Sequence, residues 1–389
     1  RPTKLGRRWL AAWEERQPGR SDEELAVVIA RQYEDTYHVS KAKAELAADI
    51  AIREEKLIKR LDPDKGFSLY VGVPFCPTRC LYCSFTSNAI GACSRLVEPT
   101  LEAMKKEIRD AGSILRHNRP DTVYIGGGTP TSLSAEQLED LMGAIGESFD
   151  LSGTLEYTVE AGRADSITPE KLSVIRKMGA GRISVNPQTM QDETLSLIGR
   201  KASSDQVIRA FGMAREEGFD HINMDLILGL PGEDAAKVAD TLAKVEALRP
   251  DSMTVHTLAV KRGSDLHRIM TEKGYPLNPD TAPAMELAYE AAKRMGLKPY
   301  YLYRQKNMSG NQENVGFAKE GKFGIYNILI MEEVQSVYAV GAGTVSKMVY
   351  SEGSALKIER CDTHKDVELY IAGIDEMCER KRRLFCGGK

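Results

Sequence analysis

The sequence is poor in features that would direct it to a membrane or to nucleic acid. No uninterrupted apolar run approaches the roughly 20 residues that span a bilayer, and no signal-peptide pattern is visible. The net charge is only −3, which gives no overall attraction to nucleic acid or to an anionic surface. We therefore expect a cytoplasmic protein with no membrane span and no nucleic-acid partner.

Cysteine is scarce, with seven in 389 residues. Four are scattered without ligand spacing and are expected to be free thiols in a reducing compartment: Cys93, Cys361, Cys378 and Cys386. Hydrophobic residues make up 42% of the chain and charged residues 28%, which is typical of a globular protein with one large core and an appendage, or with two domains. The chain begins at Arg1 rather than at a methionine, so we expect an upstream piece to be missing.

The other three cysteines lie in one short segment. Cys76, Cys80 and Cys83 are separated by three and then by two residues. Three thiolates can hold three irons of a four-iron, four-sulfur (4Fe-4S) cluster and leave the fourth iron open for reaction. The alternative is a structural zinc site, but zinc needs four closed ligands, and the nearest further candidate is Cys93, ten residues on. The spacing favours the open cluster.

The chain changes character after its first 62 residues. Up to there, apolar residues recur at helical spacing; from Phe67 onward, short β-rich runs alternate with amphipathic helices, which indicates a parallel sheet. The expected strands are Ser68–Val73, Thr122–Ile125, Tyr157–Glu160, Arg182–Val185, Ile222–Leu228 and Met253–Ala259. The fold class is therefore α/β, with a helical segment (1–62), a partial (βα)6 TIM-like barrel (63–280) and a smaller α+β region that covers the substrate (281–389).

The α+β region is expected to contain both element types. A helix is predicted over Ala284–Met295, followed by β segments at Pro299–Arg304, Ile325–Met331 and Ser336–Val340. An amphipathic helix near Asp366–Arg383 closes the chain.

Residues able to do chemistry follow the expected strands. In parallel βα folds the active site gathers at the carboxyl ends of the strands, and Cys76, Gly126–Gly128, Glu160, Gln188 and Gly229 all stand there. Glycines allow a ligand to approach bare backbone. Buried carboxylates are costly without a partner, so Glu160 and Asp225 each need a ligand or a structural salt bridge.

The cysteine segment, with Tyr82 before its last cysteine, resembles the signature of the radical S-adenosylmethionine (SAM) superfamily. In that superfamily the methionine part of SAM chelates the open iron, and one electron from the cluster releases a 5′-deoxyadenosyl radical. The resemblance implies a 4Fe-4S cluster and SAM as cofactors. It also implies that Cys76, Cys80 and Cys83 bind the metal and act in catalysis, together with Tyr70.

Further segments resemble the oxygen-independent coproporphyrinogen III oxidase-like family, in its HemZ-type coproporphyrinogen dehydrogenase branch. They are Gly229-Leu230-Pro231, Tyr300–Met308, Tyr326–Glu333 and Gly341–Lys347. The resemblance implies that Tyr70, Gly127 and Glu160 contact the cluster-bound SAM. A second SAM would be lined by Tyr82, Gly128, Thr129, Gln188, Arg200, Asp225 and Ala259. The family's oxidase has a further cysteine after the third, where this chain has Ser84 and Phe85. The haem-chaperone branch has a histidine where this chain has Tyr326.

The implied reaction is oxidative decarboxylation of coproporphyrinogen III propionates to vinyl groups, which gives protoporphyrinogen IX. A flavodoxin- or ferredoxin-type protein would donate electrons. Substrate propionates call for cations, for which Arg304, Lys306, Lys261 and Arg262 are candidates, with solvated surface charges as the alternative. Two other functions stay open: a haem-binding or haem-delivery protein, and a radical SAM enzyme that modifies or opens haem.

Overall fold

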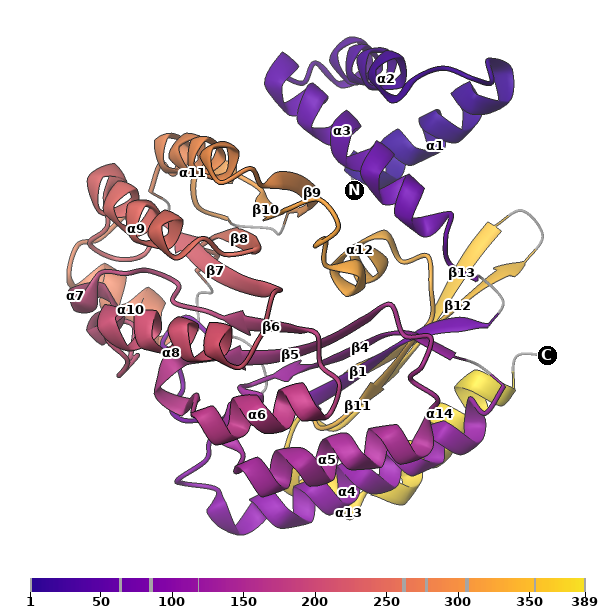
Figure 1. Cartoon of the computed structure of the whole chain (residues 1–389), viewed down its shortest axis with the longest axis vertical. Helices are drawn as coiled ribbons and strands as arrows, with labels where there is room; N and C mark the ends of the chain where they lie inside the picture. The colour runs from indigo at the N-terminus through magenta and orange to yellow at the C-terminus, as the bar shows by residue number, and fades with distance from the viewer. Residues whose placement is uncertain are drawn as a thin grey trace.

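The computed structural model describes residues 2–62, 65–83, 87–117, 119–260, 264–276, 279–304, 308–352 and 355–387. An eleven-stranded sheet runs through this part of the chain in the order β13-β12-β11-β1-β4-β5-β6-β7-β8-β10-β9. The seven central strands are parallel, and two antiparallel strands lie at each edge. Figure 1 shows that the sheet curves around an inner side. The expected α/β fold with a parallel central sheet is confirmed.

All six expected strands are present among the central seven. These are β1 (Gly66–Val73), β4 (Arg119–Gly127), β5 (Glu156–Gly162), β6 (Arg182–Val185), β7 (Ile222–Leu228) and β8 (Ser252–Thr257). The seventh, β11 (Val337–Val340), comes from the C-terminal region and pairs in parallel with β1. It matches the β segment expected at Ser336–Val340.

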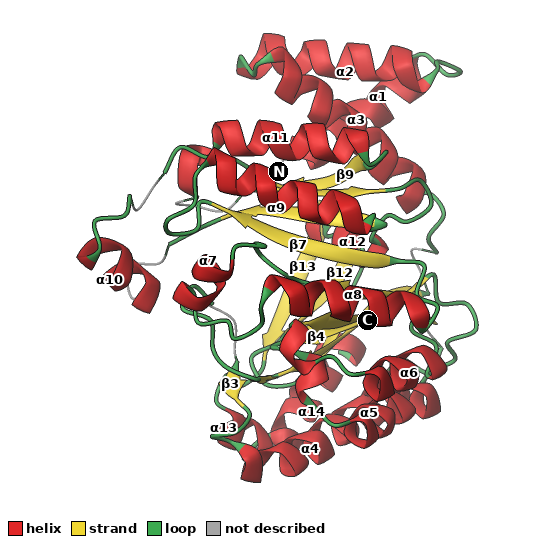
Figure 2. Cartoon of the chain, turned by 60° about the vertical axis from the view of Figure 1, so that its left-hand side comes forward, coloured by secondary structure: helices red, strands yellow, loops and turns green. Residues whose placement is uncertain are grey.

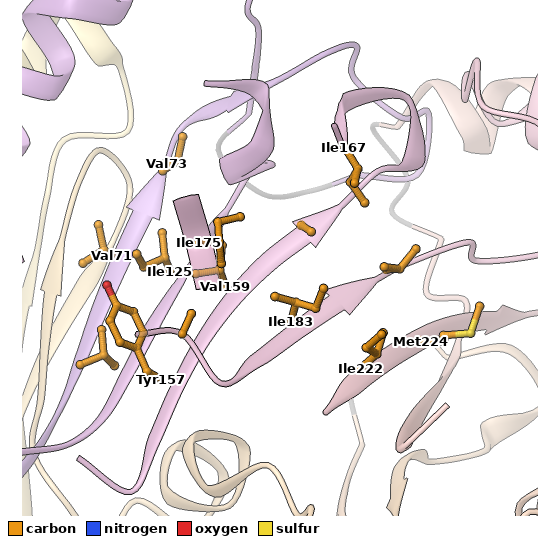
Figure 3. Packing of buried hydrophobic residues seen from close by; sticks show 14 of the residues in the cluster. Val71, Val73, Ile125, Tyr157, Val159, Ile167, Ile175, Ile183, Ile222 and Met224 are labelled. Carbon is orange, nitrogen blue, oxygen red and sulfur yellow. The ribbon is translucent and has the colours of Figure 1, made fainter. Parts of the chain in front are cut away.

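Helices cover the outer face of the sheet (Figure 2). They are α4 (Ser94–Ile114), α5 (Ala135–Ser148), α6 (Pro169–Lys177), α8 (Ser204–Glu216), α9 (Ala235–Leu248) and α11 (Ala282–Arg294). Two shorter helices, α7 (Asp192–Leu197) and α10 (Asp265–Glu272), lie in the connections. The core forms between this layer and the apolar side of each strand, where Val71, Ile125, Val159 and Ile183 pack near Ile175 of α6 (Figure 3).

The opposite side of the same strands is polar. Successive side chains of a strand point to opposite faces, so the residues between the core positions face the inner side. They include Tyr124, Glu160, Arg182, Asp225 and His256, and the charges of the last three act on Glu160. Closed TIM barrels usually fill this space with branched apolar side chains. A polar interior of this kind is suited to a ligand.

The C-terminal region extends the sheet at both edges. At one edge of the sheet, β10 (Asn314–Ala318) pairs with β8 and β9 (Lys298–Tyr303) pairs with β10. At the other edge, β12 (Val345–Glu352) pairs with β11 and β13 (Ala355–Asp362) pairs with β12. The strand expected at Pro299–Arg304 is therefore confirmed.

Two expectations for this region were wrong. Residues 325–331 were expected to be extended but form helix α12 (Ile325–Glu332), which lies on the inner side of the sheet (Figure 1). Its apolar residues are buried on several sides, so the short run has no clear helical period and resembles a strand. The closing helix is interrupted at Gly373, giving α13 (Val367–Ala372) and α14 (Ile374–Cys386).

The first 62 residues form three helices at one end of the molecule (Figure 1): α1 (Pro2–Arg16), α2 (Asp22–Tyr37) and α3 (Lys41–Ile58). Charged contacts dock them on α12, where Arg7 donates to Glu332 over 2.8 Å and Thr3 donates to the same carboxylate over 2.8 Å. Among the described residues, no helix has the length and apolar character to cross a membrane.

Candidate active site

The cysteine segment forms a loop at the carboxyl end of β1. Cys76 lies on a short strand, β2 (Phe75–Cys76), which pairs with β3 (Asn88–Ala89). The loop also leans on the segment after α7, because Leu81 N donates to Ile198 O over 3.0 Å and Thr78 Oγ1 donates to Gly199 O over 3.2 Å. These contacts fix the middle of the cysteine loop to the segment that follows α7.

The three thiols lie close enough to act on one another electrostatically. Burial raises the pKa of the Cys76 thiol, the Thr129 hydroxyl 3.4 Å away lowers it, and the nearby thiols of Cys83 and Cys80 raise it again. Nowhere in the described part of the chain do three His, Cys, Asp or Glu side chains gather tightly enough for a single metal ion. Three soft thiols on one loop match the donor set of an iron–sulfur cluster.

The glycine-rich turn after β4 packs directly on this loop. Gly128 N donates to Val73 O over 2.7 Å, and Thr129 N donates to Phe75 O over 2.7 Å. A Cβ on Gly128 would lie 2.4 Å from Phe75 O and 3.0 Å from Cys76 Sγ, so no larger residue fits. Gly127 has φ +104°, which other residues rarely adopt. The turn therefore brings bare backbone beside the thiols.

Glu160 closes β5 one strand further on. Its Oε1 accepts a hydrogen bond of 2.5 Å from Tyr124 Oη, and its Oε2 would lie 2.9 Å from a Cβ on Gly126. Burial raises the pKa of Glu160 to about 7, although the Tyr124 hydrogen bond lowers it. In the part of the chain that the structure describes, its hydrogen-bond partner is thus a tyrosine and not the arginine of a structural salt bridge.

Three stacked tyrosines border Glu160. The Tyr124 ring lies 6.2 Å from that of Tyr70 of β1 and 4.4 Å from that of Tyr326 of α12, measured between centroids, so the three rings form a triangle. Tyr70 and Tyr326 are 6.0 Å apart and nearly parallel. This tyrosine stack, Tyr70–Tyr124–Tyr326, forms an aromatic wall between the glycine turn and α12.

A second group of polar residues lies on the other side of the cysteine loop. Arg200 donates from Nη2 to Tyr82 Oη over 3.3 Å and from Nη1 to the carbonyl of Asn186. Burial alone would lower the pKa of Arg200, but the Tyr82 and Cys80 groups raise it. Gln188 has φ +68° and donates its N–H to Asp225 O over 2.9 Å. The structure therefore brings these predicted residues together.

Several buried atoms of this group have no hydrogen-bond partner within the described residues: Gln188 Oε1, Arg200 Nε and Asn186 Oδ1. Native proteins pair nearly all buried polar atoms. Three such atoms near one another are polar groups that a bound ligand would satisfy.

Asp225 belongs to a network that sequence reasoning only partly found. It accepts from Asn223 Nδ2 over 2.7 Å, and its Oδ2 lies 3.9 Å from His256 Nε2. Burial would raise the pKa of Asp225, but His256 and Asn223 hold it below its usual value. His256 Nδ1 is 3.3 Å from Tyr303 Oη. The residues that were missed are His256 on β8 and Tyr303 on β9. Each alternates with core residues along its strand, and this alternation is visible in the sequence.

The remaining predicted residues lie at the barrel rim or beyond the described part. Ala259 forms an antiparallel bridge with Met308, and Arg304 is exposed just after β9. The other candidate cations and the positions after the third cysteine lie outside the described residues: Lys306, Lys261, Arg262, Ser84 and Phe85.

Comparison with known proteins agrees with this geometry. The radical SAM superfamily model matches residues 70–245. The oxygen-independent coproporphyrinogen-III oxidase-like protein HemZ of Bacillus subtilis is 39% identical over 358 residues, which cover 88% of this chain and 71% of that protein. The heme chaperone HemW of the same organism is 32% identical over 281 residues, covering 71% and 69%. The Escherichia coli oxygen-independent coproporphyrinogen III oxidase is 30% identical over 197 residues, covering 51% and 43%.

Among solved structures, the coproporphyrinogen III oxidase HemN of Escherichia coli superposes with a TM-score of 0.65 at 21% identity, covering 84% of this chain and 73% of that one. The shared fold is that of a radical SAM protein, a class whose cofactors are a 4Fe-4S cluster and SAM. Within that class, the chain belongs to the oxygen-independent coproporphyrinogen III oxidase-like family, with HemZ-type relatives.

Proposed function

We propose that the chain is a radical SAM oxidoreductase that converts coproporphyrinogen III propionates to vinyl groups, giving protoporphyrinogen IX. One observation carries the proposal. Glu160, Asp225 and His256 lie near one another on the inner side of the sheet, and the glycine turn beside Glu160 packs on the cysteine loop. The 39% identity to an oxidase-like relative supports the substrate class.

The cofactors would bind at the carboxyl end of β1. Cys76, Cys80 and Cys83 would hold the cluster, and the glycine turn brings backbone without side chains close to Cys76 Sγ. When bound, the cluster and SAM would supply the radical that removes a hydrogen atom from a propionate β-carbon. The substrate would then lose carbon dioxide and pass one electron to an external one-electron acceptor, which leaves the vinyl group. The bare backbone of Gly127 and the carboxylate of Glu160 would bind the ammonium group of SAM, with Tyr70 beside them.

Glu160 and Tyr124 would act as one unit in this step. The Tyr124 hydroxyl holds Oε1, which leaves Oε2 directed toward Gly126 and the turn. An incoming ammonium would favour the ionised carboxylate, which burial alone disfavours. The tyrosine stack excludes water from one side of the site.

The second polar group would bind a further SAM molecule. The unpaired Gln188 Oε1 and Arg200 Nε are matched to a ligand that carries both donors and acceptors. Tyr82, Asp225, Gly128, Thr129 and Ala259 would complete this subsite.

The tetrapyrrole would enter from the rim of the barrel. Arg304 stands there at the end of β9, next to Tyr303, and a guanidinium suits the carboxylate of a propionate. The sequence adds Lys306 to this proposed contact. A flavodoxin- or ferredoxin-type protein would supply electrons to the cluster.

An anaerobic assay tests the proposal. The chain, with a reconstituted cluster, is incubated with coproporphyrinogen III, SAM and a low-potential reductant, and the product mass is read. We expect loss of two carboxyl groups and release of 5′-deoxyadenosine and methionine. Tight haem binding with no product from coproporphyrinogen would overturn the proposal in favour of a haem-binding or haem-modifying function, as the name of the 32% identical relative suggests.

Ligand variants provide the controls for this assay. Cys76→Ala, Cys80→Ala and Cys83→Ala should each lose the cluster absorbance and SAM cleavage, because each removes one of three thiolates. Cys93→Ala should keep both, since Cys93 lies beyond the loop at the start of α4. A variant at Cys80 that still holds a full cluster would contradict the ligand assignment.

A further inference from the structure

A buried arginine that the proposed function leaves without a role bridges β5 and the cysteine loop. Arg163 follows the end of β5, three residues after Glu160, and is only 3% exposed. Asp165 binds one side of its guanidinium with two hydrogen bonds, Nε to Oδ1 over 3.0 Å and Nη2 to Oδ2 over 2.7 Å. This bidentate pair fixes the plane and direction of the fork.

The remaining nitrogen of the fork is committed to the cysteine loop. Arg163 Nη1 donates to Thr78 O over 2.9 Å and to Thr78 Oγ1 over 2.7 Å. The same nitrogen lies 3.9 Å from Cys80 Sγ and is directed toward it. Thr78 stands between the first two cysteines of the loop, so the guanidinium fixes the loop at its middle.

The three sulfurs therefore have different neighbours. Cys76 Sγ is 3.4 Å from the Thr129 hydroxyl, and Cys83 Sγ is 4.0 Å from the Ser87 hydroxyl. Cys80 has the cationic fork of Arg163, and Arg200 also acts on it electrostatically. Cys80 is thus the sulfur in the more positive environment.

A structural role alone does not account for this arrangement. A buried guanidinium is costly to desolvate, and Asp165 would neutralise it equally well if the fork turned away from the thiols. Instead, Nη1, which also binds Thr78, shares one of its N–H groups with the Cys80 thiol. Hydrogen bonds to sulfur and nearby charge are the means by which proteins set the potential of an iron–sulfur cluster. Reduction adds a negative charge, which a buried cation stabilises.

We infer that Arg163 is a positioning residue for the cluster: it fixes the Thr78–Cys80 half of the loop to the strand that carries Glu160, and it raises the reduction potential of the cluster through Cys80. The inference rests on the proposed assignment of the three cysteines as ligands. Because Arg163 and Glu160 share one strand end, the same anchor sets the position of the cluster relative to the SAM site.

The test is a redox titration of the anaerobically reconstituted full chain, without SAM or substrate, followed by electron paramagnetic resonance. We expect Arg163→Gln to lower the midpoint potential by about 59 mV or more, which is a tenfold smaller reduced-to-oxidised ratio at the same applied potential. Arg163→Lys keeps the charge but not the fork, and should fall between this variant and the wild type. Arg79→Gln is the matched control, because it removes the same charge from an exposed position next to Cys80.

The outcomes are distinct. Wild-type potentials in both Arg163 variants would overturn the inference, and so would a shift in Arg79→Gln as large as that in Arg163→Gln. If Arg163→Gln binds no iron, Arg163→Lys decides: a midpoint potential below that of the wild type would support the inference, and a wild-type potential would overturn it. A wild-type chain that binds no cluster would overturn the ligand assignment itself, and this inference with it. A normal wild-type cluster with no effect at Arg163 would overturn the inference alone.

Discussion

The ring of Tyr326 lies 4.4 Å from that of Tyr124, with the two planes 23° apart. One ring comes from a helix late in the chain and the other from the second barrel strand, and Tyr124 in turn binds Glu160. The C-terminal region therefore helps to position a carboxylate of the candidate active site. This contact makes α12 part of the site rather than a separate cover.

Removing the Tyr326 ring should affect both stability and ligand binding. Tyr326→Ala deletes a buried aromatic side chain, which typically costs about 3–5 kcal/mol, and it leaves Tyr124 without its closer stacking partner. We expect a lower urea midpoint and weaker SAM binding by calorimetry. Tyr326→Phe keeps the ring and should retain both properties; equal losses in the two variants would contradict the stacking role.

SAM affinity should depend on pH through Glu160. Its pKa of about 7 in the ligand-free protein means that the carboxyl is largely protonated below pH 7, whereas an ammonium requires the ionised form. Affinity should therefore rise as pH increases toward 7, by up to tenfold per unit, and level off above it. Glu160→Gln should lower affinity about tenfold or more, since losing the charged acceptor costs about 1.5–3 kcal/mol, and it should flatten the profile. A wild-type profile that is flat from pH 6 to pH 8 would argue against this role.

Arg304 should matter for substrate and not for the cofactors. If its guanidinium holds a propionate, Arg304→Ala should lower coproporphyrinogen turnover several-fold while SAM cleavage without substrate stays near the wild-type rate. Liquid chromatography of 5′-deoxyadenosine and of porphyrin products measures the two rates in one sample. A parallel loss of both activities would place Arg304 in the fold or in the SAM site instead.

A buried ion pair on the outer side of the sheet should dominate local stability. Lys381 of α14 and Glu107 of α4 are fully buried, and the same carboxylate accepts from Gly341 N over 2.9 Å and from Tyr370 Oη over 2.6 Å. Lys381→Met leaves Glu107 uncompensated and should cost about 3–5 kcal/mol, measured by urea unfolding. The exposed Lys365→Met should change stability by less than about 0.5 kcal/mol.

Local pattern was sufficient for the central strands. Two of them, β6 and β7, have the predicted ends, because in each a short stretch with alternating apolar residues is bounded by turns. The pattern failed for Ile325–Met331, where burial on several sides of a short helix removes the 3.6-residue period. It also did not reveal that β11 pairs with β1, since pairing partners are set by the tertiary fold and not by local propensity.

The residues of the candidate site also divide into those that local sequence pattern reveals and those that only the folded chain reveals. Residues next to strand ends, such as Glu160 and Gln188, were found because the carboxyl edge of a parallel sheet is a general site of chemistry. Arg163 was missed although it also follows a strand, because its role depends on contacts with Thr78 and Cys80, which only the folded chain brings near. His256 alternates with core residues on its strand, but its partners Asp225 and Tyr303 lie on other strands, so its place in the site could be recognised only in the folded chain.

The pairing of β1 with β11 has a consequence for how the chain folds during its translation. Strand β1, which leads into the cysteine loop, has β4 on one side and β11 on the other, and β11 is translated only near the end of the chain. On the ribosome, one edge of β1 stays unpaired for on the order of tens of seconds. Until then, the strand that leads into the cysteine loop has β4 as its only partner in the sheet, so the support of the loop is complete only after β11 has been made.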